Sequence, residues 1–146
     1  ELESSTGVTI SWIYDVEGED KFHERQTDLL KKLVKQSNVV LATGSDVILK
    51  QENRTLLSSN GLVIFLATEV DYQLKRIRRK EHRPLLQVDD VEDCLTKMRK
   101  ERTPLYQSIA DVSFDTAVSS IRSVSKKIVR FLEESGYRAY NESPPE

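Results

Sequence analysis

Short apolar runs that alternate with helical patterns constrain the fold of this chain more than any other feature. Residues 38–43 read NVVLAT and residues 62–66 read LVIFL, whereas residues 111–115, DVSFD, alternate between polar and apolar side chains. Runs of this length without polar alternation are typical of strands buried on both faces of a parallel sheet. The sequence therefore predicts three strands, two of them fully buried.

The segments between these runs carry apolar residues at helical spacing. We expect a helix over 24–36, a polar loop and helix over 46–60 that ends at Gly61, a basic helix over 70–79, a helix over 91–109 that is interrupted or kinked near Pro104, and an amphipathic helix over 118–132. Helices that alternate with buried strands imply crossover connections. The prediction is an α/β fold in which a parallel sheet is flanked by helices on both faces, although three strands are few for such a sheet.

Composition argues against several classes of function. The 146 residues carry a net charge of −2, which gives no overall attraction to nucleic acid or to an anionic membrane. The longest apolar runs have five or six residues, too few to cross a bilayer. The one cysteine, Cys94, cannot form an internal disulfide, which fits a reducing compartment such as the cytoplasm. Its spacing from His23 and His82 is not that of a metal site, so we expect no metal ligands.

The strongest local charge feature is residues 75–83, KRIRRKEHR, in which six of nine residues are Lys or Arg. A solvated helix face and a polyanion site both fit this density. No aromatic residues interleave with the basic ones, so a base-stacking groove for nucleic acid is poorly supported. A phosphorylated small molecule needs a few fixed arginine forks, and Arg83, followed by a stiffening Pro84, suits that role. Arg102, near Pro104, could point into a cleft, but an arginine on a charged helix is more often surface decoration.

No segment of these 146 residues can form a P-loop. That motif needs G-x-x-x-x-G-K-[ST], and none of the five glycines precedes a lysine. Nothing here can therefore wrap the phosphates of ATP in backbone N–H groups.

Four segments together resemble the shikimate kinase family: VVLATG at 39–44, VILKQENRTLLSSNGLVIFLAT at 47–68, HRPLL at 82–86 and ERTPLYQSIADVSFDT at 101–116. The resemblance runs from Glu1 to about Leu132 with few or no gaps. The family consists of small P-loop kinases of the nucleoside-monophosphate-kinase type, with a three-layer fold. They move the γ-phosphate of Mg-ATP onto the 3-hydroxyl of shikimate, on the route to chorismate and the aromatic amino acids. The resemblance implies a cytoplasmic enzyme that uses ATP and Mg²⁺.

The resemblance also implies roles for individual residues. Arg83 corresponds to the lid arginine that reaches the transferred phosphate, which makes it the expected catalytic residue and part of the nucleotide site. Arg76 matches an arginine near the adenine, and Arg102 matches one that pairs with the shikimate carboxylate. Gly44 matches the first glycine of a Gly-Gly-Gly turn that cradles shikimate. These roles are physically sensible, because phosphoryl transfer depends on positioning and on positive charge around the phosphate oxygens.

Two substrate motifs depart from the family pattern. The Gly-Gly-Gly turn reads Gly44-Ser45-Asp46 here, which adds side chains where the substrate should lie and a negative charge that should repel its carboxylate. The motif F-R-x-x-E reads FHERQ at 22–26, so His23 replaces an arginine that also holds this carboxylate. His23 can still donate a hydrogen bond to substrate, but it has neither a permanent charge nor a bidentate fork. Arg25 could partly substitute.

The largest difference from the family pattern concerns the segment that precedes Glu1 in relatives. Relatives begin with a strand, the P-loop, a helix and a strand that ends in an Asp-x-Asp pair serving magnesium and shikimate, and Glu1 aligns just past that pair. We therefore expect that a strand-helix-strand unit of ~30 residues is absent. In this fold the P-loop strand lies between the strands that match 39–43 and 62–67. Its removal leaves unpaired edges, which invite pairing with another chain. We expect a monomer for a complete protein and self-association for a truncated one.

These observations leave two main functional hypotheses. In the first, the protein is a shikimate kinase whose 146 residues, a domain over 1–135 and a flexible tail over 136–146, are inactive on their own. In the second, it is a non-catalytic, kinase-like interaction or regulatory protein. Nucleic-acid binding through residues 75–83 rests on charge density alone. The expected partners are therefore the small molecules shikimate and ATP, without nucleic acid or membrane.

Overall fold

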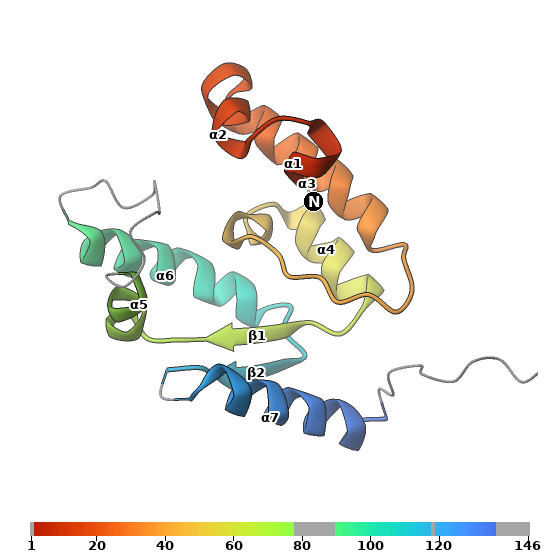
Figure 1. Ribbon diagram of the computed structural model, residues 1–146, viewed down its shortest axis with the longest axis vertical. Coiled ribbons are helices and arrows are strands. Elements are labelled where there is room, and N and C mark those ends of the chain that lie inside the picture. Colours follow the sequence, from red (N-terminus) through yellow and green to blue (C-terminus); the bar gives the residue numbers. More distant parts are fainter. Residues whose placement is uncertain (1, 78–89, 118, 137–146) are drawn as a thin grey trace, which may run out of the picture. The chain divides into compact units, whose positions relative to one another are not determined.

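The computed structural model describes residues 2–77, 90–117 and 119–136 (Figure 1). The chain forms two compact units, residues 1–62 and residues 63–146, which we call unit 1 and unit 2.

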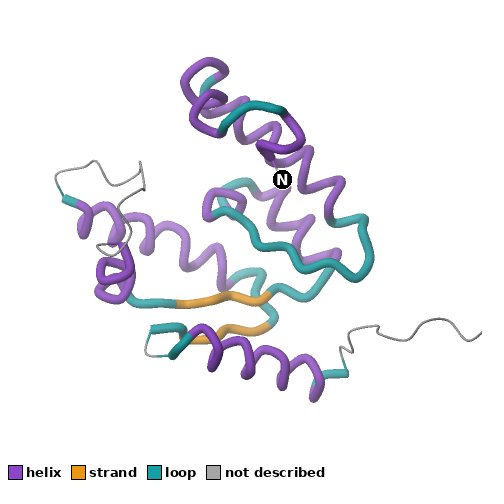
Figure 2. Tube along the Cα trace, viewed as in Figure 1, coloured by secondary structure: helices purple, strands orange, loops and turns teal. Residues whose placement is uncertain are grey.

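Throughout its described residues, unit 1 consists of helices and loops (Figure 2). Its elements are α1 (Leu2–Thr6), α2 (Ile10–Trp12), the π-helical turn η1 (Ile13–Glu17), α3 (Glu19–Leu33), the 3₁₀ turn η2 (Ser45–Ile48) and α4 (Gln51–Asn60). The helix expected over 24–36 is present as α3, and it begins and ends earlier than expected. Gly18, at a φ of 85°, separates η1 from α3. Glu19 and Asp20 in the first turn and two lysines in the last turn complement the dipole of α3.

A small apolar core holds unit 1 together. The buried apolar side chains come from η1, α3 and η2: Ile13, Phe22, Leu30, Val47 and Ile48. The ring of Tyr14 lies 4.5 Å from that of Phe22, which packs η1 against α3. An ion pair between Lys31 Nζ and Glu52 Oε1, at 2.7 Å, joins α3 to the first turn of α4. The polar loop and helix expected over 46–60 are therefore confirmed.

The strand expected over 38–43 is wrong, because these residues form a loop. Val40 is 98% exposed and Val39 is 43% exposed, so the apolar run is not buried. An extended segment becomes a strand only when a neighbour takes up its backbone hydrogen bonds. Within the described ranges the sheet contains two strands, and neither of them pairs with this run.

Unit 2 contains β1 (Ile64–Ala67), α5 (Val70–Ile77), α6 (Val91–Gln107), β2 (Val112–Asp115) and α7 (Ile121–Glu134). The two strands are parallel, with Ile64 opposite Val112 and Ala67 opposite Asp115. At the start of the ladder, Asp111 donates its N–H to Val63 O at 3.0 Å, and Asp111 Oδ2 accepts from Val63 N at 2.7 Å. The expected strands near 62–66 and 111–115, and their parallel arrangement, are confirmed.

Helices cover both faces of this sheet, as expected. Side chains alternate between the faces of a strand, and in this register Phe65 and Phe114 point to opposite faces. Phe65 stacks on Tyr106 of α6 with ring centroids 4.9 Å apart, and Phe114 meets Phe131 of α7 edge-on at 6.0 Å. Accordingly, α6 and α7 lie on either side of the β1–β2 pair in Figure 1.

The helix boundaries of unit 2 follow local capping. Asp90 caps α6 by accepting from Asp93 N at 3.0 Å, and Ser120 caps α7 by accepting from Ser123 N at 3.2 Å. The interruption that we allowed near Pro104 is absent: α6 continues to Gln107, because Pro104 lies in its last turn and removes one helical donor there. The helix expected from residue 118 begins at Ile121. Residue 118, the end of the basic helix beyond residue 77 and the tail over 137–146 lie outside the described residues.

None of the helices in the described part of the chain combines the length and the apolar composition that a membrane span requires.

Candidate functional site

His23 is the first of the predicted substrate residues, and it lies on the buried side of α3 with 9% of its surface exposed. Its Nε2 is 3.5 Å from Glu19 Oε1, whereas its Nδ1 is buried and has no hydrogen-bond partner. The backbone carbonyl of His23 accepts from Thr27 Oγ1 at 2.9 Å, which locks this turn of the helix. The imidazole is therefore buried, with Nε2 near Glu19 and Nδ1 without a hydrogen-bond partner.

Gln26 and Gly44 lie next to each other within unit 1. A Cβ built on Gly44 would be 4.0 Å from Gln26 Nε2, an ordinary contact distance, and Gln26 Oε1 is buried without a hydrogen-bond partner. The loop that begins η2 thus approaches the face of α3 that carries Gln26, one turn after His23. Gly44 has a φ of −70°, so its backbone does not itself require glycine.

The turn that follows Gly44 is held by the apolar core of unit 1 and by hydrogen bonds from Arg54. Val47 and Ile48 are buried in the core of unit 1, which holds η2 down. Arg54 Nη1 donates to the carbonyls of Ile48 at 2.7 Å and Leu49 at 2.8 Å. Residues 44–49 therefore form a defined turn, even though two of the three glycines expected from the resemblance are Ser45 and Asp46.

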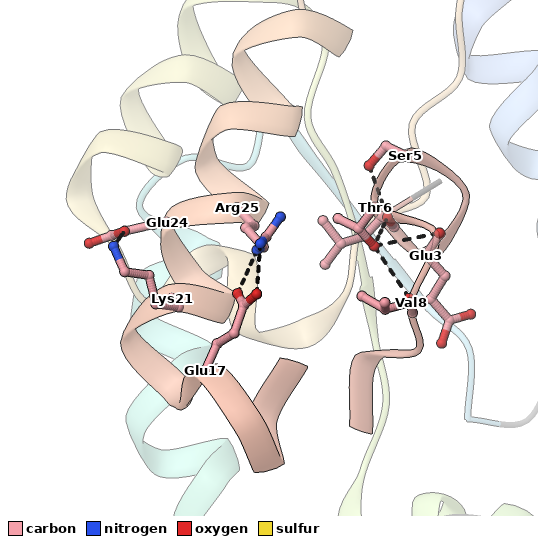
Figure 3. Close-up of polar contacts among 9 residues, drawn as sticks. Glu3, Ser5, Thr6, Val8, Glu17, Lys21, Glu24 and Arg25 are labelled. Atoms are coloured by element: carbon pink, nitrogen blue, oxygen red, sulfur yellow. Dashed lines mark hydrogen bonds and ion pairs between the residues drawn. The ribbon is translucent and has the colours of Figure 1, made fainter. Parts of the chain in front are cut away.

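Arg25 does not take the place of the missing arginine. It is two residues from His23, about 200° around the helix, so the two side chains leave α3 on opposite sides. Its guanidinium forms two hydrogen bonds of 2.7 Å with Glu17 (Figure 3). This pairing lowers the pKa of Glu17 and raises that of Arg25. A shallow pocket on the same side is lined only by charged residues, Glu17, Lys21, Glu24, Arg25 and Asp28.

Arg76, on α5, braces the carboxyl ends of the two strands. Its Nη2 donates to the carbonyl of Thr116 and its Nη1 lies 3.4 Å from Thr116 Oγ1. Thr116 in turn donates to Ala67 O from its N–H at 2.8 Å and from its hydroxyl at 3.1 Å. Ligands of α/β proteins bind at this edge of a parallel sheet. Arg76 therefore lies at the expected edge, with its guanidinium engaged by the protein.

Arg99 is a second arginine at this edge, and it was not among the predicted site residues. Its Nη1 donates to Thr68 O at 2.9 Å, and its Nη2 pairs with Glu69 Oε1 at 2.7 Å. Thr68 follows β1, so α6 holds the exit of that strand. The only available signal was the helical spacing of Arg99 and Arg102, which places both on one side of α6. Arg102 Nε and Nη1 are buried, which argues against surface decoration.

The predicted site residues thus fall into two groups. Gly44 and the helix that carries His23 lie together in unit 1, whereas Arg76 and Arg102 belong to unit 2. Arg83 lies outside the described residues. Within the described ranges, no group of three or more His, Cys, Asp or Glu side chains comes together to hold a metal ion.

A parallel strand pair with helices on both faces, and with arginines at the carboxyl ends of its strands, defines an α/β protein. A family model described as shikimate kinase matches residues 1–133. The shikimate kinase of Legionella pneumophila strain Corby is 41% identical over 131 residues, which cover 90% of this chain and 75% of that protein. The enzyme of Vibrio parahaemolyticus is 41% identical over 133 residues, which cover 91% of this chain and 77% of that protein. This chain belongs to the shikimate kinase family.

Solved structures agree with the assignment. Shikimate kinase from Acinetobacter baumannii in complex with shikimate superposes with a TM-score of 0.85 at 37% identity, covering 94% of this chain and 76% of that chain. Shikimate kinase from Bacteroides thetaiotaomicron gives a TM-score of 0.81 at 22% identity over 92% of this chain and 79% of that chain, which supports the fold alone.

The family implies the use of ATP and Mg²⁺. The residues present do not by themselves fit these groups: the sequence has no P-loop pattern, and the described residues offer no cluster of metal ligands. Arg76, the residue matched to the adenine site, is bound to Thr116.

Proposed function

We propose that this protein acts in the ATP-dependent phosphorylation of the 3-hydroxyl of shikimate. The observation that carries the proposal is the match to shikimate kinases over residues 1–133, at 41% identity to the relatives from Legionella and Vibrio. The Acinetobacter relative, whose structure contains shikimate, supports the choice of substrate.

The residue roles form part of this proposal. Gly44, His23 and Arg102 would contact shikimate, Arg83 would reach the transferred phosphate, and Arg76 would lie near the nucleotide. The approach of Gly44 to α3 and the buried guanidinium atoms of Arg102 support the substrate roles. Charge from arginine around the phosphate oxygens is what phosphoryl transfer requires.

We further propose that the 146 residues alone do not transfer phosphate, because no P-loop pattern occurs among them. An assay of ADP release with shikimate and Mg-ATP tests both statements. The chain alone should show no turnover, and a version extended at its amino end by a P-loop segment should phosphorylate shikimate. An extended version that has a P-loop and binds ATP, yet leaves shikimate unmodified, would contradict the proposed activity.

A second candidate is a non-catalytic, kinase-like interaction or regulatory protein. It is favoured by the changes at Ser45, Asp46 and His23, and by the engagement of Arg25 with Glu17. Calorimetry separates the two candidates: the kinase requires that shikimate binds this chain, whereas the non-catalytic protein requires neither shikimate nor ATP.

The remaining expectations are a cytoplasmic location, one domain over residues 1–135 with a tail over 136–146, and self-association of the 146-residue chain. Sedimentation velocity at several concentrations tests the last of these. A strictly monomeric chain would show that the apolar loop over 38–43 does not mediate pairing.

A further inference from the structure

Two arginines tie helix α5 to the carboxyl ends of the strand pair. Arg99 of α6 donates from Nη1 to Thr68 O at 2.9 Å and pairs through Nη2 with Glu69 Oε1 at 2.7 Å. Arg76, in the last turn of α5, donates to the carbonyl of Thr116. The function proposed above gives a role to Arg76 and none to Arg99.

The connection between β1 and α5 consists of only two residues, Thr68 and Glu69 (Figure 1). The carbonyl of Glu69 accepts from Tyr72 N at 3.1 Å and from Gln73 N at 3.0 Å, and these bonds start α5. A connection this short leaves the helix little freedom relative to the strand. By holding both residues, Arg99 fixes the place where α5 begins.

The two ties lie on roughly the same side of α5. Arg76 comes seven residues after Glu69, and two turns of an α-helix contain about 7.2 residues. A rotation of α5 by one residue, about 100°, would turn Arg76 away from Thr116. The contact between Arg76 and Thr116 therefore depends on where the helix begins.

Thr116 connects this helix back to β1. It follows β2, and it donates to Ala67 O from its N–H at 2.8 Å and from its hydroxyl at 3.1 Å. Ala67 is the residue just before Thr68, which Arg99 holds. The chain that runs from Ala67 through α5 and back over Arg76 is therefore a closed ring, which Arg99 anchors to α6.

The two contacts of Arg99 differ in weight. The side chain of Glu69 is 65% exposed, and an exposed ion pair contributes little because water screens it. The bond to the Thr68 carbonyl is partly buried and has a charged donor, which makes it the stronger of the two.

We propose that Arg99 is a positioning residue: it sets the start and the rotation of α5 and thereby holds the guanidinium of Arg76 at the carboxyl end of β2. This inference rests on the proposed function, in which Arg76 lies near the nucleotide. Arg99 acts through Arg76 and not by contact with a substrate.

Nuclear magnetic resonance tests this positioning on the 146-residue chain. Arg99→Met should shift the Nε–H resonance of Arg76 and the amide resonance of Thr116, because the guanidinium leaves its carbonyl. Arg99→Lys, which keeps one donor, should cause smaller shifts in the same direction. Lys100→Met removes an exposed cation from the next residue of α6 and should leave both resonances in place. Unmoved Arg76 resonances in the folded Arg99 variants would overturn the proposal.

Urea unfolding of a double-variant cycle gives a second measurement. The change that Arg76→Met causes in the unfolding equilibrium constant should be at least about threefold smaller when Arg99 is already replaced, whereas independent contacts add to within about twofold. Additive effects would show two separate braces and would overturn the positioning role.

Kinetics of the version extended by a P-loop segment connect Arg99 to the reaction. Arg99→Met should raise the KM for ATP about three- to tenfold, part of what a hydrogen bond from a charged donor contributes, and leave the KM for shikimate within about twofold. A purely structural residue would lower only the amount of active enzyme, and two unchanged KM values would therefore contradict the proposal. An extended wild type without turnover would contradict the proposed function, and the resonances of Arg76 would then decide the positioning role.

Discussion

The two units of this molecule use their polar side chains in different ways. In unit 2, Arg76 and Arg99 bind backbone carbonyls that follow the strands, and Asp111 binds the backbone where β1 begins. In unit 1, His23 Nδ1 and both amide atoms of Asn53 are buried without a hydrogen-bond partner. The difference teaches that Arg76, Arg99 and Asp111 hold the ends of the two strands, whereas His23 Nδ1 and the Asn53 amide form no hydrogen bond within the protein. Substitution of Arg76, Arg99 or Asp111 should therefore change the stability of unit 2.

The largest expected effect tests whether the two units are separate at all. Ile48 is 1% exposed, so Ile48→Ala should cost unit 1 about 2–5 kcal/mol through lost burial and a cavity. Hydrogen exchange should then accelerate in α3 and α4 and stay unchanged in β1 and β2. Equal acceleration in both units would show a single cooperative structure and would remove the basis of the comparison.

The next effect concerns the arginine that braces the strands. Arg76→Ala should destabilise unit 2 by about 1.5–3 kcal/mol, because a hydrogen bond between a charged donor and a partly buried carbonyl is lost. Urea unfolding of Arg76→Ala, Thr116→Val and the double variant gives their coupling. Thr116→Val keeps the backbone carbonyl that accepts from Nη2, so additive effects would mean that the contact between Arg76 Nη1 and Thr116 Oγ1 contributes little.

A smaller effect is expected from the clamp on the turn in unit 1. Arg54→Lys keeps the charge but removes Nη1, which donates to the carbonyls of both Ile48 and Leu49, at a cost of about 1 kcal/mol. The shikimate affinity should fall as well, because the turn after Gly44 loosens. A stability loss with unchanged binding would separate η2 from the ligand site.

The smallest effect is a pH dependence from the exposed ion pair between Glu17 and Arg25. The pKa of Glu17 is lowered in the folded state by its hydrogen bonds to Arg25. The pair therefore stabilises unit 1 fully above the ordinary pKa of a glutamate, and this contribution disappears as the pH falls through the lowered value. The urea midpoint of the wild type should thus drop slightly more than that of Arg25→Gln on acidification. Identical pH profiles would show that the pair is fully screened by solvent.

Sequence reasoning found the strands of unit 2 because their signal is local: the apolar run near 62–66 and the alternation over 111–115 each match a strand by themselves. The equally apolar run at 38–43 was assigned wrongly, because a strand also depends on a neighbour that pairs with it. Helices α6 and α7 were also predicted from local sequence signals, although the predicted boundaries differed from those in the structure.

The site was only partly predictable. The substrate roles of Gly44 and His23 came from the family resemblance and stay predictions; the structure places Gly44 next to Gln26 of α3, the helix that also carries His23. Arg99 was missed because its partners, Thr68 and Glu69, are about thirty residues away and leave no local pattern. Asn53 was missed because an asparagine between charged residues reads as surface, and only packing reveals that it is buried.

Asp111 has a consequence beyond its own hydrogen bonds. By taking the N–H of Val63 with its side chain, it stops the ladder at a fixed position and so sets the alignment of every later pair. The threonines that leave the strands lie roughly 13–16 Å farther along, at about 3.3 Å per residue. A slip of one residue in the pairing at Val63 would reverse the direction of each side chain at the carboxyl ends of the strands. The positions of the residues at the carboxyl ends of the strands are thus set at their amino ends.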